Sequence, residues 1–98
     1  MIQAQALVTT DRPSRFAEQI AERLGHEMET EWSAEVGFVK LPEGFVDMYS
    51  WPEGLRLDAF AETDEKLRRV EDELQSQLRR SPEGERLAID WYRRPLSR

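Results

Sequence analysis

A Pro-Glu-Gly tripeptide occurs three times in the chain, at residues 42–44, 52–54 and 82–84. Proline presets the backbone of the second position of a β-turn, and the glycine accepts the positive φ that follows. Turns this tight join neighbouring antiparallel strands, so they restrict this region to short, locally connected elements. We therefore predict strands over residues 35–41, 45–51 and 55–61, which form an antiparallel meander of four together with the strand predicted at residues 26–32.

Alternation of side-chain type with period two indicates three further strands, at residues 3–9, 26–32 and 86–92. In the first of these, Ala4, Ala6 and Val8 share one side. The second places three glutamates on one face, which suits a strand at the edge of a sheet because charge discourages pairing with another chain. In the last strand we expect these side chains to face the core: Leu87, Ile89 and Trp91.

Two segments have apolar residues at helical spacing. We predict one helix from Pro13 to about Leu24, with Thr10 or Asp11 as its cap and Gly25 as its stop. The second begins after the capping residue Thr63 and closes with two arginines near the negative end of its dipole. The expected buried stripes are Phe16, Ala17, Ile20, Ala21 and Leu24 in the first helix, and Leu67, Val70, Leu74 and Leu78 in the second.

The predicted order is therefore β-α-β-β-β-β-α-β. Each helix has a single narrow apolar stripe, so each buries only one side. These elements predict an α+β fold, a two-layer sandwich in which both helices cover one face of an antiparallel sheet. The length of 98 residues suits a single domain over residues 1–98. The other face of the sheet is then open to solvent or to a partner.

Charge and composition exclude several function classes. The net charge of −6 repels phosphate backbones and anionic lipid, so we expect no nucleic acid and no membrane as partner, although residues 79–98 alone carry +3. The absence of cysteine removes disulfides, thiolate nucleophiles and zinc ribbons. No segment is long and apolar enough to span a bilayer, and no targeting signal is recognisable, so we expect a cytoplasmic protein.

The open sheet face is the first candidate site. Side-chain alternation along two strands places these residues on the open face: Arg56, Asp58 and Phe60, and Asp90 and Tyr92. If Val46 and Met48 face the helices, a third strand adds Asp47, Tyr49 and Trp51. Aromatic rings between carboxylates suit a planar or cationic ligand, or an arginine of a partner protein. The alternative is a solvated face whose aromatic residues are present for their β-propensity.

Other candidate residues have weaker patterns. Asp47, Asp58 and Asp90 carry oxygen ligands for a hard cation, but their spacing matches no ligand loop, so we predict no metal site. His26, the only histidine, suits the C-terminal cap of the first helix or, with a suitable nucleophile nearby, a general base. Two arginines at the start of that helix oppose its dipole and could pair locally or grip a carboxylate or phosphate: Arg12 and Arg15.

Several segments resemble the bacterial family of domain of unknown function 2218. The resemblance starts at residues 10–16, continues through 24–27, 55–59 and 67–71, and ends at 87–91. The chain departs from the family pattern near the end of the second helix, where Gln77-Leu78 and Arg79-Arg80 replace a His-Leu and an Arg-Phe. The resemblance carries no established activity. It implies a context of iron-siderophore metabolism, because members resemble small companions of siderophore-interacting, flavin-dependent reductases.

These observations favour a non-catalytic binding or protein-interaction module that holds a protein partner or small ligand on the open sheet face, with a homo-oligomer as a further possibility. We predict no catalytic residue and no cofactor. The alternative is a small enzyme or metal-dependent accessory that uses the same face or His26. Nucleic-acid binding through the arginines of residues 79–94 fits the overall charge poorly.

Overall fold

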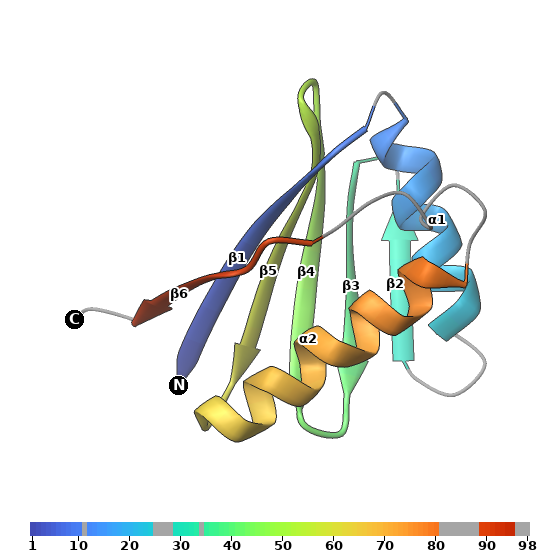
Figure 1. Cartoon of the computed structure of the whole chain (residues 1–98). Helices are drawn as coiled ribbons and strands as arrows, with labels where there is room; N and C mark the ends of the chain where they lie inside the picture. Colours follow the sequence, from blue (N-terminus) through green and yellow to red (C-terminus); the bar gives the residue numbers. More distant parts are fainter. Residues whose placement is uncertain (11, 25–28, 34, 81–88, 96–98) are drawn as a thin grey trace.

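A computed structural model describes residues 1–10, 12–24, 29–33, 35–80 and 89–95 of the chain. Its elements, in chain order, are β1 (Ile2–Thr9), α1 (Pro13–Leu24), β2 (Glu29–Ser33), β3 (Val36–Leu41), β4 (Gly44–Trp51), β5 (Gly54–Ala61), α2 (Asp64–Arg79) and β6 (Tyr92–Pro95). The six strands form one sheet in the order β2-β3-β4-β5-β1-β6, and every neighbouring pair is antiparallel (Figure 1). The glutamate-rich strand β2 lies at the edge, as predicted.

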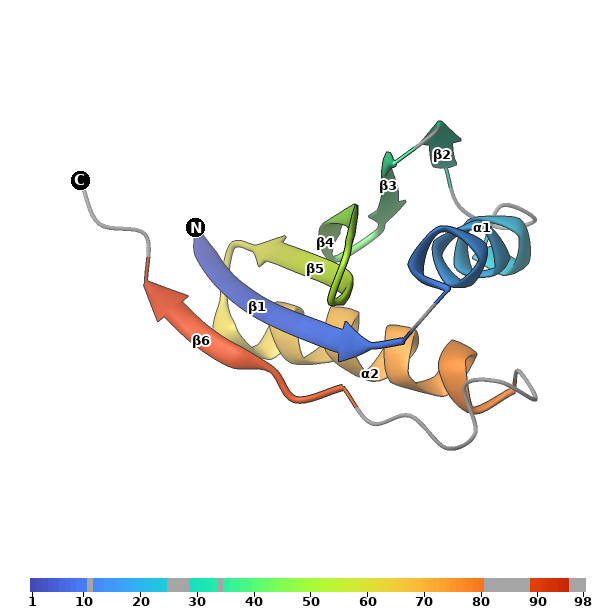
Figure 2. The same ribbon diagram turned by 90° about the horizontal axis from the view of Figure 1, so that it is seen from above.

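Both helices cover the same face of the sheet (Figure 2). α1 packs on β2, β3, β4 and β5, α2 packs on β1, β4 and β5, and the two helices contact each other. One hydrophobic cluster fills the space between the layers, and its largest fully buried side chains include Phe16, Met48, Leu55, Leu57, Leu67 and Leu74. The predicted α+β sandwich and its element order are confirmed.

Local hydrogen bonds explain where the helices begin. The Lys66 amide donates to the Thr63 hydroxyl at 3.2 Å, so Thr63 caps α2 as predicted. Before α1 the Thr10 hydroxyl accepts from the amide of Arg12, the residue directly before the helix, at 3.1 Å, and Pro13 occupies the first helical position. The polar side chains before each helix therefore satisfy amides that have no partner within the helix.

The two described Pro-Glu-Gly turns differ in why they need glycine. Gly54 has a φ of +155°, and a Cβ there would also meet the Val8 carbonyl oxygen. Gly44 has no positive φ, so the sequence-based prediction is wrong at this residue; glycine is needed there because a Cβ would meet the backbone of Phe60. The third turn, at residues 81–84, lies outside the described residues, as do Asp11 and Gly25.

The last strand is the main correction to the predicted boundaries. β6 begins only at Tyr92, and its partners on β1 run from Ile2 to Gln5. Residues 89–91 form no strand. The Ile89 amide instead donates to the Gln75 side-chain oxygen on α2 at 3.1 Å, so contacts with the helix hold this segment rather than a ladder of strand hydrogen bonds. Residues 86–88 and the side chains of Leu24 and Leu78 are outside the description.

Candidate functional site

The face of the sheet opposite the helices, here called the outer face, carries most of the predicted site residues. On β4, Val46 and Met48 are fully buried toward the helices, so Asp47, Tyr49 and Trp51 point outward as expected. Antiparallel Cα partners place their side chains on the same face. One line of such partners crosses the whole sheet through Glu31, Phe38, Asp47, Asp58, Gln5 and Tyr92, and is called the acidic row.

The neighbouring line of partners holds an arginine, Arg56, opposite Leu7 and Tyr49. Arg56 lies two residues before Asp58 on β5, so both side chains point outward and meet. Arg56 Nη2 lies 3.2 Å from Asp58 Oδ2, and Nε donates to Oδ1 at 3.3 Å. The same guanidinium lies 5.0 Å from the centre of the Trp51 ring and 5.9 Å from that of Tyr49. One arginine therefore links a carboxylate to two aromatic rings.

Asp58 is on the outer face but is not open to solvent. Its side chain is only 8% exposed, whereas that of Arg56 is 29% exposed. The expectation of a solvent-open carboxylate is therefore corrected, because the ion pair with Arg56 and the neighbouring strands on both sides enclose it. A carboxylate so enclosed depends on its cation for stabilisation.

Asp47 is the cross-strand partner of Asp58, but among the described residues it has no ion pair with a cation. Burial raises the pKa of the Asp47 carboxyl above its ordinary value of 3.8, and the charge of Asp58 raises it further. Burial and the charges of Asp47 and Asp58 also raise the pKa of the Tyr49 hydroxyl, while Arg56 acts in the opposite direction. Within the described part of the chain, no hydrogen bond or ion pair reaches Asp47. The ionised form of Asp47 is thus disfavoured in the folded protein.

The direction of this pKa shift predicts a pH dependence of stability. A carboxyl whose folded pKa is raised contributes stability that is fully present below about pH 3.8 and is lost as the pH rises through its folded pKa. We expect Asp47→Asn to raise the free energy of unfolding by about 0.5 kcal/mol near neutral pH and to leave it unchanged below about pH 3. Urea unfolding at several pH values measures this. Asp72→Asn, an equal charge change on the exposed face of α2, is the control; equal effects of both substitutions would contradict the assignment.

Apolar side chains are also exposed on the outer face. Among the described residues, the exposed large hydrophobic side chains are Met1, Leu7, Val36, Trp51 and Tyr92, and the last four all lie on this face. Phe45 and Phe60, directly paired across β4 and β5, stack with ring centres 4.8 Å apart. Exposed apolar groups gathered on one face, beside paired charges, are typical of an interaction surface.

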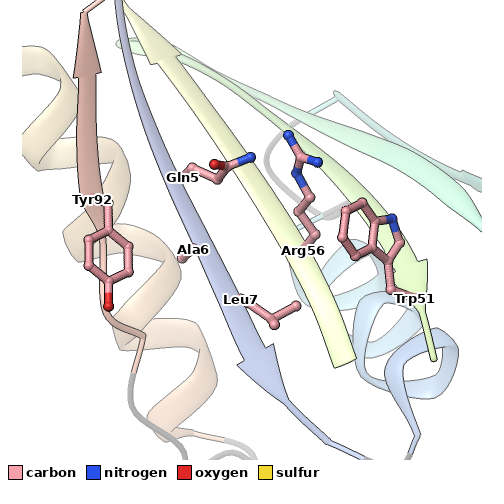
Figure 3. A pocket seen from close by; sticks show the side chains of 6 residues that line it. All are labelled: Gln5, Ala6, Leu7, Trp51, Arg56 and Tyr92. Carbon is pink, nitrogen blue, oxygen red and sulfur yellow. The ribbon is translucent and has the colours of Figure 1, made fainter. Parts of the chain in front are cut away.

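Two open hollows lie on the described part of this face. One has a volume of about 350 Å³, and in Figure 3 Gln5 and Leu7 on β1 lie between Tyr92 on β6 and the Arg56–Trp51 pair. The other, called the acidic hollow, has a volume of about 310 Å³. Its lining includes Glu31, Ser33, Val36, Phe38, Asp47 and Tyr49.

Some predicted site residues are not brought to this surface. Asp90 is exposed but precedes β6 and belongs to no strand, so the strand alternation from which it was projected does not extend to it. Arg12 and Arg15 are exposed at the start of α1, in the helix layer. His26 lies outside the described residues. Within the described residues, no group of three or more His, Cys, Asp or Glu side chains converges to hold a metal ion.

Sequence reasoning missed the contribution of β2 and β3 to the site, namely Glu31, Ser33, Val36 and Phe38. Apolar residues occur on both sides of β3, so its alternation does not say which side faces the core. Pairing with β4 would have identified them. If Val39 and Val46 are partners in the core, then Phe38 and Asp47 are partners on the opposite face.

Comparisons with known proteins fit this description of the fold. A family model described as "Uncharacterized protein conserved in bacteria (DUF2218)" matches residues 5–92. The NMR structure of PA4090 from Pseudomonas aeruginosa is similar to this chain, with a TM-score of 0.74 and 21% sequence identity over 94% of this chain and 96% of that one. That likeness shows the fold alone. The comparison with curated proteins found no match. Among the described residues, no helix is long and apolar enough to cross a membrane.

Proposed function

The chain belongs to the DUF2218 family of uncharacterized bacterial proteins, and from this premise we propose that it is a non-catalytic module that binds a protein partner on its outer face. The observation that carries the proposal is the gathering of Leu7, Val36, Trp51 and Tyr92 on the side of the sheet that the helices leave uncovered. Tryptophan, tyrosine and arginine are the residues that most often dominate binding energy at protein interfaces. This face presents all three.

A photo-crosslinking experiment tests which face meets a partner. Tyr92, on the outer face, and Arg68, exposed on α2, are replaced in separate proteins by p-benzoylphenylalanine. We expect irradiation of bacterial cells to yield one dominant heterologous product from position 92 and none from position 68. Equal products from both positions, or none from position 92, would contradict the proposal. A product that consists of two copies of this chain would also contradict it, and would show that the outer face mediates self-association instead.

Purified partner then allows a quantitative test. Leu7→Ser removes apolar surface from the outer face, and because Leu7 is already 44% exposed the fold should tolerate the change. We expect the dissociation constant measured by calorimetry to rise about tenfold, corresponding to about 1.4 kcal/mol. Arg68→Ser, an exposed substitution in the helix layer, should leave it unchanged. Equal weakening by both substitutions would argue against docking on the sheet.

The siderophore context implied by the family resemblance gives the first partner to try. A siderophore-interacting reductase from the same bacterium should bind the wild-type chain, and Leu7→Ser should weaken that binding. Failure of the reductase to bind would remove this partner without affecting the assignment of the outer face.

The alternative of a metal-dependent accessory that uses three aspartates is not supported by their positions. Asp47 and Asp58 are cross-strand partners, but Asp90 belongs to no strand, and among the described residues no three carboxylates converge to hold a metal ion. The other alternative, a small enzyme that uses His26, depends on a residue outside the described part of the chain.

A further inference from the structure

We propose that the acidic hollow receives an arginine side chain of the protein partner. This inference rests on the proposed function, since it assigns one contact within the same outer face. It starts from a charge imbalance. Arg56, in the neighbouring line, is engaged by Asp58, and within the described part of the chain no ion pair reaches Asp47 or Glu31. A cation entering the hollow would approach both of these carboxylates.

The position of Asp47 makes an incoming cation favourable. Its side chain is partly buried and faces Asp58 across the strands, so the isolated negative charge is poorly solvated. A positive charge in the hollow would stabilise the ionised form, and the attraction would be stronger than at a fully hydrated surface carboxylate.

The aromatic lining favours a guanidinium over an ammonium. Phe38 and Tyr49 both line the hollow beside Asp47. A guanidinium is planar and weakly hydrated, so it can stack on a ring while donating to a carboxylate. The protein already contains this arrangement one row away, where Arg56 bonds Asp58 and lies over the rings of Trp51 and Tyr49. The acidic hollow offers the same kinds of group without a guanidinium of its own among the described residues.

The surroundings indicate that the arginine belongs to a protein. Val36, at the rim of the hollow, is 51% exposed, and Trp51 on the same face is 42% exposed. A free small cation would fill the hollow and leave these apolar side chains in water. A protein surface that presents an arginine among apolar residues would cover both at once.

A titration with N-acetyl-arginine methylamide tests the hollow itself. We expect saturable changes in the amide NMR signals of residues 37–38 and 47–49, with a dissociation constant of about 1–10 mM because a single side chain binds. The citrulline analogue has nearly the same shape but no charge, and should give no saturable change. Equal binding of the citrulline or lysine analogue would overturn the assignment of an arginine, as would changes located elsewhere.

Two variants sharpen the test. Asp47→Asn should weaken binding of the arginine probe at least tenfold, whereas Asp72→Asn, with the same change in net charge, should not. Equal effects would mean that only overall charge matters, and would overturn the proposal. Binding of the whole partner separates the two inferences: if Leu7→Ser weakens it but Asp47→Asn does not, the outer face remains the docking site and the acidic hollow does not.

Discussion

Replacing Gly54 with alanine is expected to lower the free energy of unfolding by about 2–4 kcal/mol. Two independent costs combine at this residue. Its φ of +155° is a conformation that residues with a side chain rarely adopt, and the new Cβ would meet the Val8 carbonyl oxygen. Gly54 is paired with Trp51 on one side and Thr9 on the other, so the backbone has little freedom to relax.

Thermal unfolding followed by circular dichroism checks this expectation. For a domain of this size a loss of 2–4 kcal/mol corresponds to a fall in Tm of roughly 10–25 °C. Glu53→Ala, in the same turn and at an exposed position, is the control and should change the stability by less than about 0.5 kcal/mol. A Gly54→Ala protein as stable as the control would show that β1 can move away from the turn.

Replacing Arg56 with methionine is expected to cost about 2–3 kcal/mol near neutral pH. Methionine keeps much of the apolar stem that packs on the sheet, so the loss reports mainly on charge. Without the guanidinium, the enclosed carboxylate of Asp58 faces Asp47 with no cation bonded to it. The contacts with Trp51 and Tyr49 are lost at the same time.

A double-mutant cycle measured by urea unfolding separates these contributions. Adding Asp58→Asn to the Arg56→Met protein should restore at least about 1 kcal/mol, because it removes the unpaired charge. Acidification should also recover part of the loss, since protonation of Asp47, whose pKa is raised by burial and by the charge of Asp58, ends the repulsion between the two side chains. If Asp58→Asn is equally destabilising with and without Arg56, the ion pair contributes nothing measurable to stability.

The success of the sequence-based prediction of the outer face has a simple physical origin. Side chains alternate along a strand, and on β4 the buried Val46 and Met48 flank the polar Asp47; on β1 Ala4, Ala6 and Val8 share the buried side, although Leu7 on the other side is apolar as well. Since only one side of the sheet can be shielded by two single-stripe helices, the pattern identified which residues point away from them. Asp47, Arg56, Asp58 and Phe60 were placed correctly for this reason.

The strand assignment failed at residues 89–91, although Ile89 and Trp91 do pack in or against the core and Asp90 is exposed, as their alternation predicted. Ile89 and Trp91 alternate with Asp90 just as strand residues do, yet the hydrogen bond from the Ile89 amide to Gln75 holds this segment against α2. A side-chain carbonyl from a helix can satisfy a backbone donor as well as a strand can, and local sequence does not reveal which partner is nearby.

Local chemistry along the chain was therefore enough to establish the first five strands, the two helices, the cap at Thr63 and the side of the sheet left open, because alternation, helical spacing and capping depend on neighbours within a few residues. The pairing of Arg56 with Asp58, the uncompensated charge of Asp47 and the hollow between β2, β3 and β4 were decided only by the folded sheet. They depend on the register between strands, which brings Phe38, Asp47 and Asp58 side by side. Charge and burial act through space, and sequence distance alone does not specify those separations.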